Sequence, residues 1–361
     1  MNNRVMVAMS GGVDSSVAAL MLKRQGWDCT GVTMKLFGNE DVGLTREDAC
    51  CSLSDAADAR SVSSMLNMDH FVFNMSREFE ESVVDRFVSE YIAGRTPNPC
   101  IDCNRFVKFE KLFAKAVATG HDYIATGHYA RISREISGRY ILRKARDASK
   151  DQSYVLYSMT QEQLSRALLP LGDLLKSEVR EIAAAHGFRN ANKRESQDIC
   201  FVPDGNYADF IERRTGRVFG PGYFLDENGR AIGRHRGCIR YTIGQRRGLG
   251  MGFSKRKFVC SKNHAENTVT LGNEDSLYSK VLYADDINLV AAERFDGRAR
   301  VAARTRYRQE EQPAIAEMTG DDIMRVEFDV PQRAAASGQA VVLYVGDVVF
   351  GGGTIVETRA K

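Results

Sequence analysis

The chain has 361 residues, of which 43% are hydrophobic and 27% charged, and its formal net charge is +3. This is the composition of a globular protein with two or three hydrophobic cores, and no stretch reaches the roughly 18 apolar residues of a membrane helix, which excludes a membrane protein. Eight cysteines are too few for a disulfide-stapled secreted scaffold, and neither a basic leader nor an apolar signal segment opens the sequence, so we expect a cytosolic, reducing compartment.

The first two hundred residues alternate short apolar runs with amphipathic ones. The apolar runs predict strands at residues 5–9, 30–37, 71–75 and 123–130. Spacings of three or four residues predict helices at 15–25, 78–91 and 105–119, followed by two more at 161–169 and 176–186. Alternation of this kind indicates a parallel sheet covered by helices, which is an α/β fold.

The pattern changes near Pro203. Short segments punctuated by glycine come first, and runs of alternating polarity at 281–290, 299–307, 323–330 and 340–350 then predict a small β-barrel. We therefore expect an N-terminal nucleotide-binding domain with a parallel sheet (1–205), a small central domain (206–277) and a C-terminal β-barrel domain (278–361).

A glycine–serine segment follows the first predicted strand and opens the first predicted helix. It reads Ser10-Gly11-Gly12-Val13-Asp14-Ser15-Ser16. Paired glycines let the backbone fold around an anion, the hydroxyls of the serines can donate to it, and a helix N-terminus adds partial positive charge. The segment lacks the Walker lysine that reaches a terminal phosphate, so it indicates a cradle for a departing pyrophosphate. A glycine turn capped by serine is the structural alternative.

This segment resembles the SGGxDS loop of the ATP pyrophosphatases (the PP-loop superfamily), which adenylate a carbonyl oxygen and let a nucleophile displace AMP. The resemblance implies ATP as the cofactor, with Mg2+ near Asp14 to neutralise the pyrophosphate. It also implies that the second strand contacts adenine through the backbone of Met34. The other residues implied in nucleotide binding are Ala8, Met9, Ser10, Gly11, Gly12, Val13, Asp14 and Ser15.

Three cysteines lie in unusual surroundings. Cys100 and Cys103 belong to the segment TPNPCIDCN (96–104), whose two prolines predict an open loop that ends just before the helix at 105–119. A thiol beside a helix N-terminus has a lowered pKa, so we expect a reactive thiolate here. Cys200 follows about a hundred residues later, within SQDICF (196–201). Two thiols brought together by folding could exchange sulfur and finish as a disulfide.

Other fates of cysteine remain open. Structural zinc would need a fourth ligand, and no second Cys-x-x-Cys pair or close His pair supplies one. An iron–sulfur cluster could be held by Cys100, Cys103 and Cys200 with one iron site open. Burial as an inert thiol is the ordinary fate of cysteine. We assign that fate to Cys29, Cys50, Cys51, Cys238 and Cys260.

Five motifs in this order resemble the bacterial tRNA-specific 2-thiouridylases, and the similarity runs nearly end to end. They are SGGVDSS, TPNPCIDCN, ATGHYA (125–130), KDQSYVL (150–156) and SQDICF. The resemblance implies an enzyme that replaces oxygen by sulfur at C2 of the wobble uridine of a tRNA. ATP would adenylate the C2 oxygen, and a protein outside this chain would supply the sulfur as a persulfide.

The resemblance also assigns roles to single residues. The nucleophile matches Cys103 and the persulfide carrier matches Cys200, and the two would finish as a disulfide. Gly127 matches a second nucleotide contact. Contacts to the target base match Asn98, Pro99 and Cys100, although many members have Asp in place of Cys100. Contacts to the rest of the tRNA match His128, Lys150, Asp151, Gln152, Arg306, Tyr307 and Gln339. For His128, a buried core imidazole is the alternative.

Positive charge is concentrated in two places. Residues 228–265 hold ten Lys or Arg, Arg246 and Arg247 among them, and no acid, so the rest of the chain carries −7. A solvated basic face is the alternative to a polyanion site here. The second place has arginines on even positions only, which would line one face of a strand for phosphates or protect an edge strand from aggregation. These are Arg298, Arg300, Arg304, Arg306 and Arg308.

The sequence thus predicts an ATP-dependent tRNA sulfurtransferase of the cytoplasm whose partners are tRNA and a persulfide donor, with no membrane. A variant of this function would use a [4Fe-4S] cluster on the three cysteines. Two other classes stay open. A sister ATP pyrophosphatase would form an amide from an acyl-adenylate, and a noncatalytic RNA-binding protein would have no use for the glycine–serine loop or the paired thiols.

Overall fold

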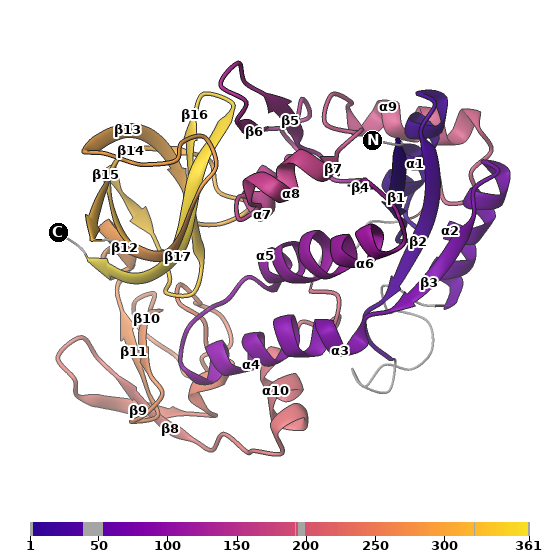
Figure 1. Cartoon of the computed structure of the whole chain (residues 1–361). Helices are drawn as coiled ribbons and strands as arrows, with labels where there is room; N and C mark the ends of the chain where they lie inside the picture. Colours follow the sequence, from indigo (N-terminus) through magenta and orange to yellow (C-terminus); the bar gives the residue numbers. More distant parts are fainter. Residues whose placement is uncertain (1–2, 39–52, 192, 194–198, 321, 360–361) are drawn as a thin grey trace. The chain divides into compact units, whose positions relative to one another are not determined.

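The computed structural model describes residues 3–38, 53–191, 193, 199–320 and 322–359. It divides the chain into two compact units, each assembled from several segments (Figure 1). The first unit comprises Met1–Val84, Pro99–Gly205 and Asp347–Phe350. The second unit comprises Asp85–Asn98, Asn206–Gly346 and Gly351–Lys361.

A five-stranded parallel sheet forms the centre of the first unit. Its strands are β1 (Arg4–Ala8), β2 (Asp28–Lys35), β3 (His70–Asn74), β4 (Tyr123–Ala125) and β7 (Ala167–Leu168). Their order is β3-β2-β1-β4-β7, and Val5 of the central strand is in register with Cys29 on one side and Tyr123 on the other. Val5, Met6 and Val7 are buried, as expected of a parallel strand with helices on both faces.

Helical segments connect these strands. Those between the strands are α1 (Val13–Arg24), α2 (Leu53–Met65), α3 (Ser76–Phe79), the π-helical η1 (Glu80–Val84), α5 (Pro99–Asp102), the π-helical η2 (Cys103–Leu112), α6 (Phe113–Ala118), α7 (Ser153–Leu156) and α8 (Gln161–Arg166), and α9 (Lys176–Ala185) follows β7. A β-hairpin of β5 (Arg131–Arg134) and β6 (Tyr140–Arg143) lies between β4 and α7 in the chain. The strand order reverses between β3 and β4, so right-handed connections place α1 and α2 on one face and α5, η2 and α6 on the other (Figure 1).

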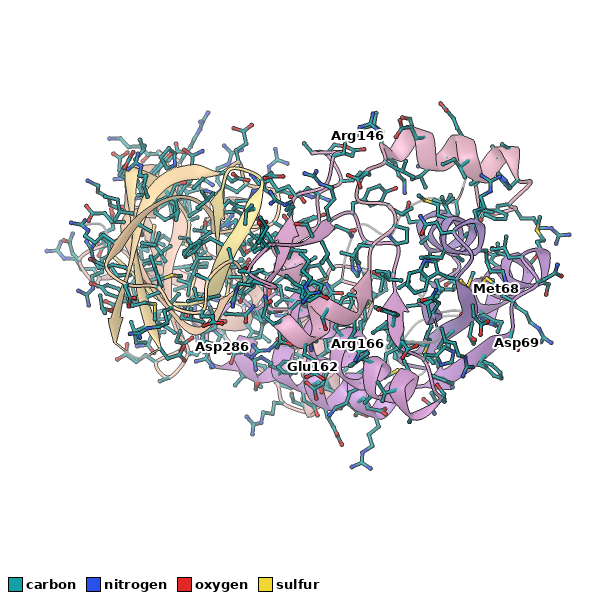
Figure 2. The ribbon with its side chains drawn as sticks, turned by 45° about the horizontal axis from the view of Figure 1, so that its top comes forward. Met68, Asp69, Arg146, Glu162, Arg166 and Asp286 are labelled. Carbon is teal, nitrogen blue, oxygen red and sulfur yellow. The ribbon has the colours of Figure 1, made fainter. Side chains whose placement is uncertain are left out.

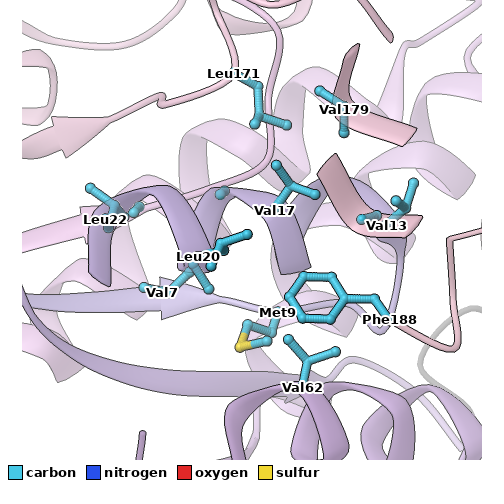
Figure 3. Packing of buried hydrophobic residues seen from close by; sticks show 14 of the residues in the cluster. Val7, Met9, Val13, Val17, Leu20, Leu22, Val62, Leu171, Val179 and Phe188 are labelled. Carbon is cyan, nitrogen blue, oxygen red and sulfur yellow. The ribbon is translucent and has the colours of Figure 1, made fainter. Parts of the chain in front are cut away.

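One apolar cluster ties β1 to its helices (Figure 3). Val7 and Met9 pack there with Val17 of α1, Val62 of α2 and Val179 of α9, and all five are buried. Burying an aliphatic side chain contributes roughly 1.5–3 kcal/mol, so this cluster fixes the start of α1 against the end of β1. Residues 10–12 are thereby held at the carboxyl edge of the sheet, where open α/β sheets bind ligands.

The second unit contains a small sheet with helical segments around it. Its elements are α4 (Asp85–Ile92), α10 (Tyr207–Thr215), β8 (Gly222–Leu225), β9 (Ala231–His235), the 3-10 turn η3 (Cys238–Arg240), β10 (Phe258–Asn263), β11 (Thr268–Gly272) and the 3-10 turn η4 (Glu274–Leu277). The strand order is β10-β11-β8-β9. Phe224, Cys238 and Val259 lie in its buried core.

A six-stranded antiparallel barrel completes the second unit. Its strands are β12 (Tyr278–Leu289), β13 (Arg298–Arg304), β14 (Gln312–Gly320), β15 (Ile323–Arg333), β16 (Ala340–Val345) and β17 (Val348–Arg359). The order β12-β15-β14-β13-β16-β17 closes on itself because β12 also pairs with β17. Closure leaves the barrel without an unpaired edge strand, so edge protection does not explain the arginines of β13.

The α/β arrangement followed by a β-barrel is confirmed, whereas several predicted boundaries are wrong. The strand predicted at 123–130 ends at Ala125, because the following residues approach α1 as a loop. The strand predicted at 299–307 ends at Arg304. The strand predicted at 340–350 is a hairpin whose turn contains Gly346 at φ +62°. No helix in the described ranges has both the length and the apolar character needed to cross a bilayer.

Candidate active site

The loop between β1 and α1 has the geometry of an anion cradle. Gly11 adopts φ +73°, and a Cβ there would lie 2.4 Å from the carbonyl oxygen of Asp55, so only glycine fits. Gly12 is the N-cap of α1, and no side chain caps the helix. The backbone N–H groups of the first turn therefore lack helical partners and face the loop. This geometry argues against the alternative of a serine-capped turn.

Two of the three serines expected to contact phosphate are used inside the loop. The Ser15 hydroxyl donates to the Gly12 carbonyl at 3.0 Å and accepts from the Ser10 backbone N–H at 3.2 Å. The Ser16 hydroxyl also donates to the Gly12 carbonyl, at 3.0 Å. In this structure the Ser15 and Ser16 hydroxyls close the loop, and their contact with an anion stays a prediction. Ser10 is exposed, and its hydroxyl has no partner among the described residues.

A clamp that the sequence did not reveal holds the loop from outside. The side-chain amide of Asn190 donates to the Gly11 carbonyl and to the Ser16 hydroxyl, each at 2.9 Å. The Lys193 ammonium lies 2.6 Å from a carboxylate oxygen of Asp55 and 2.6 Å from one of Asp58, both on α2. No sequence motif marks these residues, because the contacts join segments that are more than a hundred residues apart.

Asp14 lies at the centre of a second group of contacts. The Lys176 ammonium, at the first residue of α9, lies 2.6 and 2.7 Å from the two carboxylate oxygens of Asp14. The Tyr129 hydroxyl donates to one of these oxygens at 2.7 Å. Gly127 approaches the same turn so closely that a Cβ on it would lie 2.7 Å from the backbone nitrogen of Ser15. The predicted residues Asp14, Ser15 and Gly127 therefore come together.

Asp14 does not offer a magnesium site as it stands. Both of its carboxylate oxygens accept from Lys176, and within the described residues no three His, Cys, Asp or Glu side chains gather as metal ligands. The expected proximity of Mg2+ to Asp14 is not supported by this geometry, and no step below passes through the ion. Met34, the expected adenine contact, follows Val32, which is the last residue of β2 that pairs with β1. It therefore lies at the same edge of the sheet as the loop.

The segment with Cys100 and Cys103 is helical, which corrects the predicted open loop. α5 begins at Pro99 and passes into η2 at Cys103. Proline is well tolerated in the first turn of a helix, where its missing N–H would have had no partner, so Pro99 starts the helix and does not prevent it. Cys100 is exposed in the first turn, whereas Cys103 is half-buried one turn later.

The Cys103 thiol is also less acidic than the sequence suggested. Burial raises its pKa, the Lys108 charge lowers it, and the Asp102 charge raises it again. Burial also lowers the pKa of His128 well below its usual range, with the Lys108 charge acting in the same direction, so this imidazole is neutral at pH 7. The Lys108 charge thus acts on both groups, and its ammonium donates to the side-chain oxygen of Asn104 at 2.9 Å. The expectation of a lowered thiol pKa is therefore wrong.

A continuous series of contacts connects the glycine–serine loop with Cys103. Tyr129, which binds Asp14, donates its backbone N–H to the side-chain oxygen of Gln152 at 2.8 Å, and its carbonyl accepts from the Gln152 backbone N–H at 2.8 Å. Gln152 precedes α7, and Val155 of that helix accepts from the side chain of Asn104 at 3.2 Å. Asn104 is the residue after Cys103. The loop and this thiol are thus built on one packed scaffold.

Cys200 is partly exposed, and its neighbour Phe201 is buried against Phe79 of α3, with ring centroids 5.7 Å apart. η2, which carries Cys103, also contacts α3. Both thiol segments therefore pack on the same helix. None of Cys100, Cys103 and Cys200 forms a disulfide.

The three thiols do not form a metal site. Among the described residues no three His, Cys, Asp or Glu side chains are placed to hold a metal ion, so neither a zinc site nor an iron–sulfur cluster fits these thiols as they stand. Cys29 and Cys238 are buried, and burial raises the pKa of each to about 11, as expected of inert thiols. Cys50 and Cys51 lie outside the described residues.

The predicted tRNA contacts are divided between the two units. Lys150, Asp151, Gln152 and His128 belong to the first unit, with Pro99 and Cys100. Asp151 is buried and accepts from the Ala145 N–H at 3.0 Å. His128 is buried as well, with its Nδ1 2.7 Å from the Thr126 hydroxyl.

The second unit holds the other predicted tRNA contacts, Asn98, Arg306, Tyr307 and Gln339. The side-chain amide of Gln339 donates to the Thr96 carbonyl at 2.6 Å, so it supports the segment that leads to Asn98. The roles of all these residues toward tRNA stay predictions.

The arginines of β13 face outward but are paired with carboxylates. Arg298 lies 3.5 Å from Glu317, Arg300 donates to Asp329 at 2.7 Å, and Arg304 donates to Glu311 at 2.7 Å. The predicted continuous cationic face therefore does not exist along β13, since neighbouring strands neutralise it.

The segment 228–265, which contains no acidic residue, has exposed arginines that the described carboxylates do not neutralise as they neutralise those of β13. Arg246 and Arg247 are exposed and form no ion pair with a described residue, whereas Arg240 pairs with Asp209 and Glu212. Unpaired positive charge is thus concentrated in the segment 228–265.

Family models cover nearly the whole chain. One described as the tRNA methyl transferase HUP domain matches residues 3–204, one described as the tRNA methyl transferase PRC-barrel domain matches 208–273, and one described as the aminomethyltransferase beta-barrel domain matches 279–355. A solved 4-thiouridine synthetase–RNA complex with bound ATP is similar at 16% identity and a TM-score of 0.34, covering 59% of this chain and 50% of its own, and we draw no conclusion from so low a score.

Individual relatives are similar from end to end. The chain is 49% identical over 355 residues to the tRNA-specific 2-thiouridylase MnmA of Lachnoclostridium phytofermentans, which covers 98% of this chain and 99% of the relative. It is 51% identical over 352 residues to the protein of the same name from Moorella thermoacetica, which covers 97% and 98%. Identity of this extent, in a chain that joins a phosphate loop to two thiol segments, shows that it belongs to the tRNA-specific 2-thiouridylase family.

Proposed function

We propose that this chain is an ATP-dependent sulfurtransferase that converts uridine to 2-thiouridine at the wobble position of tRNA. The observation that carries the proposal is the series of contacts from Asp14 through Tyr129 and Gln152 to Asn104, beside Cys103. Adenylation needs a phosphate loop and sulfur transfer needs a thiol, and these contacts build the two on one scaffold. The names of the relatives point to the same reaction.

The reaction divides into an activation and a substitution. The C2 oxygen of the uridine attacks the α-phosphorus of ATP, and the pyrophosphate leaves with the electron pair of the broken P–O bond. The oxygen at C2 is then part of AMP, which is a far better leaving group than an oxide. The base must be turned out of the anticodon stack for C2 to be reached.

Sulfur then replaces the adenylated oxygen. The terminal sulfur of a Cys200 persulfide attacks C2 and expels AMP, and the thiolate of Cys103 attacks the Cys200 sulfur. The S–S bond of the persulfide breaks, the transferred sulfur stays on C2, and a Cys103–Cys200 disulfide remains. A dithiol reductant reopens it with two electrons. Burial raises the pKa of Cys103 and so opposes formation of this thiolate, whereas the Lys108 charge lowers the pKa and favours it.

The other expected roles belong to this proposal. The loop residues 8–15, with Met34 and Gly127, bind ATP, and the matched residues of both units bind tRNA. The division into domains at 1–205, 206–277 and 278–361 is proposed with them. A protein persulfide donor loads Cys200, and the substrate places the reaction in the cytoplasm. The family-model descriptions mention methyl transfer, but the phosphate loop and the thiols favour thiolation.

The test is the content of 2-thiouridine in tRNA. Cells in which the gene carries only Cys103→Ser should lose 2-thiouridine from their tRNA, as measured by mass spectrometry of digested nucleosides. Cys260→Ser is the matched control, because this partly buried thiol belongs to the second unit whereas Cys103 and Cys200 belong to the first, and it should leave the content unchanged. Normal 2-thiouridine in the Cys103→Ser cells would refute the proposal. Pyrophosphate exchange that needs no tRNA would favour the amide-forming class.

A further inference from the structure

The glycine–serine loop has no lysine of its own, but one reaches it from another helix. We infer that Lys176 binds the pyrophosphate as it leaves, and that Asp14 holds its ammonium in place while the loop is empty. This inference rests on the proposed function, because it names the group that stabilises the leaving pyrophosphate of the adenylation. Lys176 would then serve as a catalytic residue supplied by α9.

The position of the ammonium is fixed by two groups, the Asp14 carboxylate and the Tyr129 ring. Its two contacts with the carboxylate of Asp14, at 2.6 and 2.7 Å, place it beside the first turn of α1. It also lies 5.6 Å from the centre of the Tyr129 ring, where a cation is attracted by the π-electrons. The side chain of Asp14 is 30% exposed and that of Lys176 is 11% exposed. A ligand at the loop therefore meets a charge that is already positioned and largely desolvated.

Stability does not explain a lysine at this position. Lys176 is the first residue of α9, where the helix dipole disfavours a cation. Burying an ion pair costs desolvation energy that often equals its Coulombic gain. The packing of α9 against α1 is already provided by apolar residues such as Val17, Val179 and Ala183, all fully buried. The ion pair adds little to that packing, so its position beside the loop is what needs a reason.

The chemistry of the leaving group supplies that reason. When the P–O bond to the α-phosphorus breaks, its electron pair moves to the pyrophosphate oxygen, so negative charge grows there. An ammonium already beside the loop stabilises this charge through hydrogen bonds without a proton transfer. Asp14 keeps the hydrogen bond from the Tyr129 hydroxyl when the ammonium turns to the phosphate. The ammonium keeps its charge throughout, and it transfers neither a proton nor electrons.

Binding of inorganic pyrophosphate to the full chain tests the inference without tRNA. Titration calorimetry with EDTA present, so that no divalent cation bridges the two, should show at least about a 10-fold weaker affinity for Lys176→Met than for the unchanged chain. Lys176→Arg, which keeps the charge, should stay within a few-fold. Asp14→Asn removes a negative charge, so it should bind pyrophosphate as tightly as the unchanged chain or more tightly.

Arg146→Gln is the matched control. Arg146, which is labelled in Figure 2, pairs with Glu178 of α9 at 3.2 Å, so this variant loosens the same helix without removing charge from the loop. Its pyrophosphate affinity should not change. Equal affinity of Lys176→Met and the unchanged chain, with a lower unfolding midpoint for the variant, would mean that Lys176 is structural. The inference is also overturned if Asp14→Asn weakens pyrophosphate binding as much as Lys176→Met does. It is overturned as well if the unchanged chain does not bind pyrophosphate.

A second measurement separates this inference from the proposed function. In single turnovers with tRNA and ATP, Lys176→Met should form pyrophosphate at least about 10-fold more slowly, while its affinity for tRNA stays the same. If the unchanged chain forms no pyrophosphate from ATP and tRNA, the proposed function fails, and the pyrophosphate titration still decides the role of Lys176. If pyrophosphate forms at the same rate in both proteins, the proposed function stands and the role of Lys176 is refuted.

Discussion

Gly127 and Ser15 lie so close that a Cβ atom on Gly127 would be 2.7 Å from the backbone nitrogen of Ser15. The same atom would lie 2.8 Å from the carbonyl carbon of Asp14. The chain leaving β4 therefore packs backbone against backbone on the first turn of α1. This contact brings the ATGHYA motif to the glycine–serine loop, although the two are more than a hundred residues apart.

Gly127→Ala should damage both stability and nucleotide binding. The new methyl group cannot be accommodated unless the backbone of the loop shifts, and such overpacking costs about 1–3 kcal/mol. We expect a lower urea midpoint and weaker ATP binding by calorimetry. Gly252→Ala is the control, because nothing lies within 4 Å of a Cβ at that position. Unchanged ATP affinity in Gly127→Ala would show that the loop tolerates the shift.

Alkylation of Cys103 should be slow at neutral pH and should speed up as pH rises past the ordinary pKa of a thiol. Burial raises the pKa of Cys103, so little of it is thiolate at pH 7, whereas Cys100 is exposed. Iodoacetamide labelling of a Cys100→Ser chain, followed by peptide mass spectrometry, measures the profile. Lys108→Met should move the profile to still higher pH, because the Lys108 charge lowers this pKa. A profile that stays in place would remove Lys108 from the environment of the thiol.

Lys262→Met should stabilise the second unit. The Lys262 ammonium is buried without a hydrogen-bond partner among the described residues, and burial lowers its pKa. Desolvating a charge without a hydrogen-bond partner costs free energy that methionine of similar shape does not incur. The Tyr91 ring, whose centre lies 5.8 Å from the ammonium, offsets only part of this cost, so unfolding should require about 1 kcal/mol more. Urea unfolding followed by circular dichroism measures the change. Lys255→Met, at an exposed position, should change the free energy of unfolding by less than about 0.5 kcal/mol.

Acid should destabilise the second unit through His264. Burial lowers the pKa of His264 to about 4, and the Lys262 charge acts in the same direction. The unfolded state, with a pKa near 6.5, therefore takes up a proton before the folded state does, and stability falls as pH drops from about 6.5 toward about 4. We expect a loss of about 1 kcal/mol between pH 7 and pH 5. His264→Gln should flatten this dependence, and an equally steep curve in the variant would assign the effect to other groups.

Arg246 and Arg247 should contribute to tRNA binding in a salt-dependent way. Both are exposed and form no ion pair within the part of the chain that the structure describes, and each phosphate they neutralise releases counterions. Replacing both by Gln should weaken tRNA binding several-fold and reduce the slope of log K against log salt by roughly 1–2. Arg300→Gln is the matched comparison, since Asp329 already neutralises this exposed arginine, and its slope should not change. Equal slopes in all three proteins would exclude a phosphate contact at Arg246 and Arg247.

The sequence by itself determined the elements whose signals are local. The apolar runs of β1 and β2 and the Gly11-Gly12 turn follow from periodicity and backbone freedom, which neighbouring residues set. The two-residue strand β7 escaped detection because its partner β4 lies about forty residues earlier in the chain, whereas β5 and β6, which form a local hairpin, were missed although they pair with each other. The prediction of an open loop at Pro99 was wrong because proline disrupts a helix interior but is favoured in a first turn. The sequence does not show which of these positions Pro99 occupies, whereas the structure places it at the first residue of α5.

Only the tertiary structure decided which charges remain available and how acidic the thiol is. Burial of Cys103 outweighs its place near a helix start, and the carboxylates of β14 and β15 neutralise the arginines of β13. The contacts of Asp14 with Lys176 and of Gly11 with Asn190 join segments that no motif relates. Motifs specify which chemical groups are present, whereas distance and desolvation, which set their energies, exist only once the chain has folded.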